Sequence, residues 1–310
     1  SVTDRCNLRC RYCMPADGLE WLPRDQLLSF EEIARVARVC VERFGFASIR
    51  ITGGEPTVRA RLPRLVAMLS ELGVDLSLTT NGVSFGLLAG ELRRAGLRRV
   101  NISVDSLRPD RFLALTRRDA LAQVLDGVEA AVATGLSPVK VNCVLVRGVN
   151  DDEILDFAVL GRERGVTVRF IEFMPLDADQ GWSPEKVVPA AEVVATIDAA
   201  FPLEPVGGRG SAPAERLRYR DGRGEVGVVG SVSRSFCGSC DRVRLTAEGM
   251  FRNCLFAVTE TDLRAVLRGG GTDDDLAAAI AADVGTKWAG HSIGRVEFRR
   301  PSRSMSQIGG

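Results

Sequence analysis

The stretch Cys6-Asn-Leu-Arg-Cys10-Arg-Tyr12-Cys13 contains three cysteines at the spacing C-x3-C-x2-C. Three thiolates on one short loop can hold three corners of a cubane iron–sulfur cluster, because cysteine is the ligand of such clusters. A four-iron cluster with three protein ligands keeps one iron open for another molecule. The alternative is a structural zinc site, but zinc requires four ligands and no fourth Cys or His lies nearby. We therefore favour an iron–sulfur cluster.

A second group of cysteines lies near the other end of the chain, at Cys237-x2-Cys240-x13-Cys254. It also lacks a fourth Cys or His at a suitable spacing, so a second three-cysteine cluster is a better interpretation than an incomplete zinc site. The remaining cysteines, Cys40 and Cys143, lie on apolar faces and are expected to be inert core residues. Eight cysteines without a secretory signal indicate metal ligands in a reducing compartment, and we expect a cytoplasmic protein.

The overall composition is that of an ordinary globular protein. The chain has 310 residues and a formal net charge of +1, which argues against general nucleic-acid binding. No apolar run approaches the ~18 residues that a membrane span needs. His291 is the only histidine, so mechanisms built on a catalytic histidine are disfavoured.

Up to about Met174 the sequence alternates between strand and helix patterns, which predicts parallel βαβ units. Six such units are fewer than the eight of a complete (β/α)8 barrel, so we expect an incomplete, TIM-like (β/α)6 barrel. A capping box at Ser29–Glu32 begins one helix, and Gly45 ends it. The expected strands cover residues 1–3, 46–51, 74–79, 98–104, 138–146 and 166–173, and the expected helices cover 30–44, 61–72, 86–95, 119–134 and 151–164.

Beyond Met174 the pattern changes, and we divide the chain into a barrel at 1–174 and a C-terminal extension at 175–310. The extension is expected to close the open side of the barrel. A hairpin over 242–254 should bring Cys254 back beside Cys240. Other expected elements are helices at 190–200, 260–268 and 273–283, a strand at 226–232, and an exposed loop with a short strand at 205–224.

Several polar residues lie at or near the ends of the expected strands, where parallel α/β folds carry their chemistry. Thr52-Gly-Gly-Glu55-Pro56 is either a simple tight turn or a place where backbone approaches a ligand and a carboxylate meets an ammonium group. Arg242 and Arg244 form either a solvated strand edge or a site for a polyanion such as a triphosphate. Three further cations in buried strands require anionic partners, namely Arg50, Lys140 and Arg169.

These motifs together resemble one known family. Ser1-Val-Thr-Asp-Arg-Cys-Asn-Leu-Arg-Cys-Arg-Tyr-Cys-Met-Pro, ITGGEP at 51–56, TTNG at 79–82, RFIEFM at 169–174, SFCGSCDRVRLT at 235–246 and the final Gly-Gly are similar to the GTP 3′,8-cyclases of molybdenum cofactor biosynthesis, which are radical S-adenosylmethionine (SAM) enzymes. The resemblance covers nearly the whole chain.

The resemblance implies two [4Fe–4S] clusters and SAM as cofactors. The cluster that reduces SAM would be held by Cys6, Cys10 and Cys13, and an auxiliary cluster, which binds the guanine of GTP, by Cys237, Cys240 and Cys254. SAM would contact Tyr12, Gly54, Ser103 and Met174. GTP would contact Arg50, Thr79, Lys140, Arg169, Arg242 and Arg244.

The implied reaction is a radical cyclisation. A 5′-deoxyadenosyl radical would take hydrogen from C3′ of GTP, C3′ would then attack C8 of guanine, and the tail Gly309-Gly310 would assist this step. The resemblance also implies a downstream pyranopterin synthase as functional partner, leaves a homodimer open, and places a substrate-contacting Arg two positions before Ser1. Alternatives are a radical SAM enzyme with an auxiliary cluster that acts on a peptide or another small molecule, and a non-catalytic iron–sulfur electron carrier.

Overall fold

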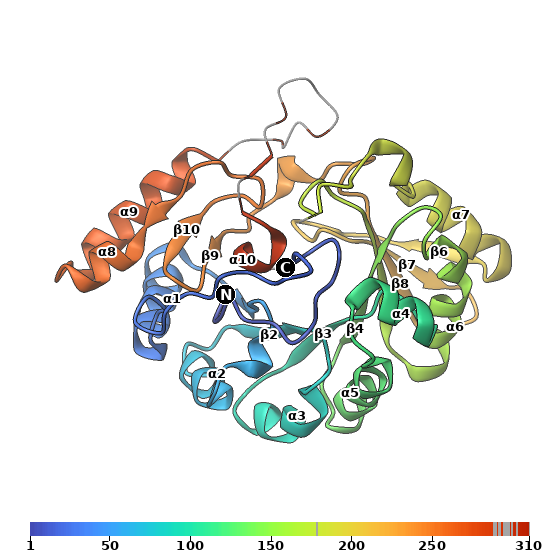
Figure 1. Cartoon of the computed structure of the whole chain (residues 1–310), viewed down its shortest axis with the longest axis horizontal. Coiled ribbons are helices and arrows are strands. Elements are labelled where there is room, and N and C mark those ends of the chain that lie inside the picture. The colour runs from blue at the N-terminus through green and yellow to red at the C-terminus, as the bar shows by residue number, and fades with distance from the viewer. Residues whose placement is uncertain are drawn as a thin grey trace.

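The computed structural model describes residues 1–177, 179–287, 290, 293, 298, 300–301 and 303–309. One curved sheet of eight strands lies at their centre, in the order β1-β2-β3-β4-β5-β8-β7-β6 (Figure 1). β1 to β5 and β8 are parallel, whereas β7 and β6 run antiparallel at the far edge. The strands are Ser48–Ile51 (β1), Asp75–Thr80 (β2), Arg99–Ser103 (β3), Val139–Leu145 (β4), Thr167–Glu172 (β5), Leu203–Val206 (β6), Glu215–Tyr219 (β7) and Glu225–Val229 (β8).

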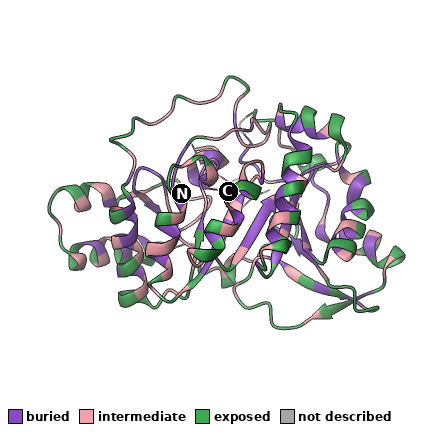
Figure 2. Ribbon diagram, turned by 90° about the horizontal axis from the view of Figure 1, so that it is seen from below, coloured by how far each residue is buried: buried purple, intermediate pink, exposed green. Residues whose placement is uncertain are grey.

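Helices cover the outer side of this sheet, and their inner faces are buried while their outer faces are exposed (Figures 1 and 2). The first helix begins and ends as predicted: Ser29 Oγ accepts from Glu32 N, the Glu32 carboxylate accepts from Ser29 N, and Gly45 ends the helix at a φ of 66°. The helices are Phe30–Phe44 (α1), Leu62–Ser70 (α2), Phe85–Arg94 (α3), Pro109–Thr116 (α4), Leu121–Ala133 (α5), Ile154–Arg164 (α6) and Ala190–Ala200 (α7).

Five of the six predicted parallel strands of the barrel are present, but the first is not. Residues 1–3 do not form a strand; they run beside the turn that follows β1, with Val2 N donating to Thr52 O and Gly54 N to Thr3 O. These hydrogen bonds join residues 1–3 to the turn beyond the end of β1 and not to β1 itself. Residues 1–3 therefore form no strand pairing with the sheet. The sixth parallel strand of the sheet is instead β8, which comes from the extension.

The segment at 205–224 agrees with the sequence prediction of an exposed loop with a short strand. Most of its residues are exposed, and it contains β7 and the end of β6. These two strands pair with each other and, through β7, with β8, which the sequence pattern did not predict. α4 was missed, although Pro109 stands at the first turn of that helix, where proline is favoured.

The rest of the extension packs against the start of the chain. A three-stranded sheet has the order β11-β10-β9, and the helices α8 and α9 share a small core with α1 that includes the buried Cys40. The predicted hairpin and both helices are therefore confirmed. The remaining elements are Arg244–Leu245 (β9), Met250–Arg252 (β10), Thr261–Asp262 (β11), Leu263–Arg268 (α8), Asp273–Gly285 (α9) and Met305–Ile308 (α10).

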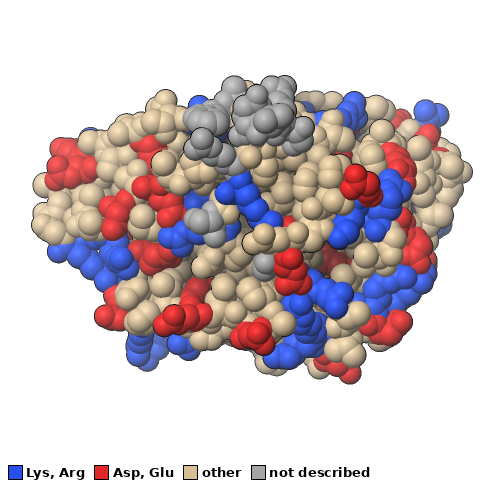
Figure 3. Space-filling model, turned by 45° about the horizontal axis from the view of Figure 1, so that its top comes forward, with Lys and Arg blue, Asp and Glu red and all other residues tan. Residues whose placement is uncertain are grey.

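The two faces of the main sheet differ in character. Aliphatic side chains of each strand pack under the helices, together with Cys143, which is buried as predicted. The opposite, inner face carries polar alternate residues over much of β1 to β5, among them Arg50, Thr79, Asn101 and Arg169. Elsewhere, basic and acidic side chains are interspersed over the surface in Figure 3. Among the described residues no helix is long and apolar enough to span a membrane.

Candidate active site

The first cysteine loop lies across the carboxyl end of β1. Gly54 N donates to Thr3 O and Glu55 N donates to Arg5 O, both at 2.7 Å, so the turn after β1 holds the segment that leads into Cys6. A Cβ on Gly54 would lie 2.5 Å from the carbonyl oxygens of Asp4 and Arg5. Glycine is required here by the close approach of two backbones.

The three thiols of this loop share one site. Burial raises the pKa of Cys10 well above its ordinary value, and the charges of Cys13, Asp105 and Cys6 raise it further. Burial, then the charge of Cys6, raises the pKa of Cys13 to about 12. Buried thiolates need a bound cation such as iron to offset their negative charge. The three thiols therefore have the donor chemistry of a metal cluster.

Among the described residues, no three Cys, His, Asp or Glu side chains converge to hold one metal ion. A single zinc ion needs its ligands around one point, whereas a cubane binds each thiolate at a different iron.

Glu55 does not offer a free carboxylate to a ligand. It is 1% exposed, its Oε1 accepts from Thr57 and from Thr80 Oγ1 at 2.7 Å, and its Oε2 accepts from Asn81 N at 2.6 Å. Asn81 Nδ2 in turn lies 3.7 Å from Cys6 Sγ and donates to Asn7 Oδ1 at 2.7 Å. The carboxylate therefore connects β1, β2 and the cysteine loop, and the suggested contact with an ammonium group is not supported.

Tyr12 is held by a residue that the sequence analysis did not single out. Tyr12 OH donates to Asp105 Oδ2 at 2.6 Å, and Val144 N donates to Asp105 Oδ1 at 2.8 Å. Burial raises the pKa of Asp105 to about 6, although these two hydrogen bonds lower it. Ser103 lies two residues earlier at the end of β3, and Met174 follows β5, both half-buried. The predicted SAM-contacting residues thus lie at or beside strand ends.

The second cysteine group is arranged around two arginines. Arg242 Nε and Nη2 donate to Cys240 Sγ at 3.3 and 3.2 Å. Burial raises the pKa of Cys240, but hydrogen bonds from the Arg242 backbone and guanidinium outweigh burial and lower it. The charges of both Cys254 and Cys240 act on Arg244, so both residues lie within electrostatic reach of this guanidinium.

Five predicted substrate-contacting cations form one electrostatic group, which we call the cation ring: Arg50, Lys140, Arg169, Arg242 and Arg244. Burial, then the charges of Arg169, Arg99 and Arg50, lowers the pKa of Lys140 to about 8. Burial, then Arg50 and Arg99, lowers the pKa of Arg169 to about 9. Burial, then Arg242, lowers the pKa of Arg244 to about 10.

In the described part of the chain no ion pair joins a carboxylate to a side chain of the cation ring; Asp75, whose charge acts on Arg50, pairs with Arg99. Arg169 is 7% exposed and donates to Asn142 Oδ1 at 2.9 Å and Asn101 Oδ1 at 2.8 Å. Arg244 Nε is buried without a hydrogen-bond partner. The Arg50 side chain is exposed, yet the protein around it and the charges of Arg242 and Arg99 lower its pKa. A group of cations without carboxylate partners is suited to bind a polyanion.

The remaining predicted contacts are placed close by. Thr79 Oγ1 accepts from Asn101 Nδ2 at 3.2 Å on the inner face. Ser306 Oγ of α10 donates to Cys13 O at 3.2 Å, and a Cβ on Gly309 would lie 2.8 Å from Thr52 Cγ2, so the chain end reaches the first cysteine loop (Figure 1). Gly310 and His291 lie outside the described residues.

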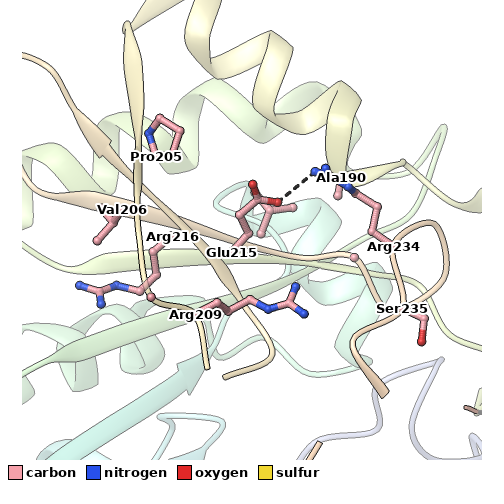
Figure 4. Close-up of a pocket in the computed structure, with 11 residues that line it drawn as sticks. Ala190, Pro205, Val206, Arg209, Glu215, Arg216, Arg234 and Ser235 are labelled. Atoms are coloured by element: carbon pink, nitrogen blue, oxygen red, sulfur yellow. Dashed lines mark hydrogen bonds and ion pairs between the residues drawn. The ribbon is translucent and has the colours of Figure 1, made fainter. Parts of the chain in front are cut away.

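A separate cavity of about 460 Å³ lies between the ends of β6 to β8 and the start of α7 (Figure 4). Arg209, Arg216 and Arg234 line it, and Arg234 forms an ion pair with Glu215 at 3.0 Å. None of the predicted site residues lines this cavity, so it lies apart from the candidate site.

Comparison with known proteins agrees with this site. The sequence profile of the Radical SAM superfamily matches residues 1–160, and that of Molybdenum Cofactor Synthesis C matches residues 166–293. "GTP 3′,8-cyclase 2" of Mycobacterium tuberculosis is 49% identical over 317 residues, covering 100% of this chain and 88% of that protein. "GTP 3′,8-cyclase" of Streptomyces coelicolor is 48% identical over 314 residues, covering 100% and 92%.

Solved structures show the fold alone. Methylornithine synthase (PylB) matches with a TM-score of 0.52 and 17% identity, over 65% of this chain and 60% of that one. Streptococcus suis SuiB bound to S-adenosylmethionine matches with a TM-score of 0.51 and 16% identity, over 64% of this chain and 45% of that one.

The two profile matches define a radical SAM protein with a C-terminal molybdenum cofactor synthesis region. The chain belongs to the GTP 3′,8-cyclase family. Proteins of this family use SAM and iron–sulfur clusters, and both cysteine groups have the donor chemistry that such clusters require.

Proposed function

We propose that this chain is a radical SAM lyase that converts GTP to 3′,8-cyclo-7,8-dihydro-GTP, the first step of molybdenum cofactor biosynthesis. The observation that carries the proposal is the cation ring, which has no carboxylate partner in the described residues and extends to the second cysteine group. A triphosphate supplies the anionic partner that these cations lack. The guanine of the same nucleotide can then reach the second cluster.

The residues at the strand ends hold the two reactants. We assign the reducing cluster to Cys6, Cys10 and Cys13 and the auxiliary cluster to Cys237, Cys240 and Cys254. When bound, the reducing cluster and SAM would supply a 5′-deoxyadenosyl radical that takes hydrogen from C3′ of GTP. C3′ would then bond to C8 as the C8=N7 double bond becomes single, and one electron and one proton from the external reductant and solvent would complete the dihydro product. SAM is positioned by Tyr12, Gly54, Ser103 and Met174, and GTP by Arg50, Thr79, Lys140, Arg169, Arg242 and Arg244.

The protein's own contribution is positioning and exclusion of water rather than acid–base catalysis. Two amide oxygens fix the Arg169 guanidinium on the inner face of the sheet without neutralising its charge. We assign the tail Gly309-Gly310 to assisting the radical step, because Gly309 lies against Thr52 and α10 contacts Cys13.

At the level of the fold, we propose an incomplete barrel of six parallel strands, with β1 to β5 from residues 1–174 and β8 from the extension at 175–310, which closes the open side. Parallel β8 beside β5, and α8 and α9 against α1, support contact of the extension with both edges of the barrel. We also propose a cytoplasmic enzyme whose product passes to a pyranopterin synthase, with a homodimer as one arrangement of the chain.

The test is anaerobic. The reconstituted protein is given dithionite and SAM, and 5′-deoxyadenosine is measured with GTP, with ATP and without nucleotide. We expect formation that depends on GTP and a cyclised guanosine product. Formation independent of nucleotide would favour another radical SAM substrate, such as a peptide, and clusters that reduce a partner without cleaving SAM would favour an electron carrier.

A further inference from the structure

A second buried carboxylate, Glu172, lies at the end of β5 and is 2% exposed. Its Oε2 accepts from Val232 N at 2.6 Å and Ser233 N at 2.8 Å. Its Oε1 accepts from Ala190 N at 2.8 Å and from the Ser233 hydroxyl. Two amides of one turn and the first amide of α7 therefore converge on one side chain.

The turn that Glu172 holds leads directly into the second cysteine group. It leaves β8 at Val229 and reaches Cys237 eight residues later. Arg234 N donates to Gly230 O at 3.2 Å, and the Arg234 guanidinium pairs with Glu215 at the surface. Phe236, the last residue before Cys237, lies beneath the Arg242 guanidinium at 4.9 Å. Glu172 is thus the buried attachment of this turn to the barrel.

Glu172 has hydrogen-bond donors but no cationic partner among the described residues. A carboxylate used for charge pairing would face Arg or Lys, whereas this one accepts only from backbone amides and a hydroxyl. Its arrangement parallels that of Glu55, which connects two strand ends to Asn81 and thereby to Cys6. A buried carboxylate that accepts from backbone amides therefore lies behind each cysteine group.

We propose that Glu172 is a positioning residue for the auxiliary cluster: it fixes the turn at Val232–Ser233 and so sets the position of Cys237 relative to the end of β5. The cluster assignment itself rests on the proposed function. Because Met174 follows Glu172 by two residues, the same strand end carries the proposed SAM contact and this attachment. Glu172 thereby fixes the position of Cys237 relative to Met174.

The experiment separates the two clusters. One background has Cys6, Cys10 and Cys13 replaced by Ala, so it can hold only the auxiliary cluster; the other has Cys237, Cys240 and Cys254 replaced. Glu172→Gln is introduced into each, because the Gln side chain keeps one acceptor oxygen and places an NH2 donor where the other oxygen accepted from backbone N–H groups. Iron per chain, the EPR signal of the reduced cluster and the rate of iron loss to a chelator are measured after anaerobic reconstitution.

We expect Glu172→Gln to lose most of the roughly four irons, or to lose them about tenfold faster, only in the auxiliary-cluster background. Glu55→Gln is the matched control, a buried carboxylate on the other side, and should show the opposite selectivity. Ser233→Ala removes only the hydroxyl donor and should show the same direction with a smaller loss, which preserves the comparison if Glu172→Gln does not fold.

Unchanged iron, EPR and chelator rate for both Glu172→Gln and Ser233→Ala would overturn the proposal, as would an equal loss in both backgrounds. Product formation by the unmutated chain is measured separately with GTP. Selective iron loss in a chain that makes no cyclised guanosine would retain the role of Glu172 and reject the proposed substrate.

Discussion

At the scale of single residues, Gly54 shows how a missing side chain positions a loop. The turn after β1 and the backbone before Cys6 approach so closely that a Cβ would overlap two carbonyl oxygens. Backbone cannot move aside as a flexible side chain can, so the cysteine loop would have to shift.

We therefore predict that Gly54→Ala destabilises the fold by about 1–3 kcal/mol and impairs loading of the first cluster. Denaturant unfolding and iron content of the chain lacking the auxiliary cysteines measure both effects. Gly207→Ala is the control, because no atom lies within 4 Å of a Cβ there and that residue has no left-handed φ. Equal unfolding free energies and equal iron contents of the two variants would show that the close backbone approach at Gly54 does not require glycine.

At the scale of elements, α10 depends on contacts outside itself. A helix of four residues is too short to be stable alone. Its Ser304–Gln307 capping box, the bond from Ser306 to Cys13 O, and the ion pairs of Arg303 with Glu248 and Glu260 hold it in place. The position of the proposed catalytic tail thus depends on the extension.

We predict that Arg303→Gln releases the tail, because it leaves Glu248 without this partner and weakens the network at Glu260. Amide exchange at Gln307 and Gly309 should accelerate, and GTP-dependent product should fall, while both clusters load normally. Arg64→Gln, which breaks an exposed pair with Glu31, should change neither measurement. Normal exchange in Arg303→Gln would mean that the ion pairs do not anchor the tail.

At the scale of the whole molecule, the cation ring costs folding free energy that an anion can offset. Lys140 has a pKa of about 8 in the folded chain against an ordinary 10.5, so the unfolded chain binds that proton more tightly. Its cost is therefore full below about pH 8 and declines as pH rises from there towards 10.5. The pKa of Arg169, lowered to about 9, acts in the same direction.

We predict that inorganic triphosphate stabilises the reconstituted protein, by about 2.7 kcal/mol at a hundredfold excess over its Kd. The rise in Tm should be larger at pH 7.5 than at pH 9.5 and smaller at high salt. Lys140→Met should raise the Tm of the unliganded protein at pH 7.5 and reduce the triphosphate effect. A triphosphate effect that is independent of pH and of Lys140 would contradict this account.

The sequence by itself determined the family resemblance, the candidate site residues that the resemblance implies, and most of the elements that present them. Two three-cysteine groups, a Gly-Gly turn after a strand, and cations in strands that should be apolar are local patterns, and hydrophobic periodicity together with caps located the helices. These patterns involve residues close together in the sequence, so they can be recognised without knowing which segments pack against them.

Only the tertiary structure decided which segments meet. β8 completes the parallel strands, residues 1–3 run along a turn instead of forming a strand, and β6 and β7 join the sheet edge. The tertiary structure also decided the contacts of Asp105 and Glu172. The hydrogen-bond donors to these two buried carboxylates come from distant parts of the chain. Such pairings depend on contacts between segments far apart in sequence, and no local pattern encodes them.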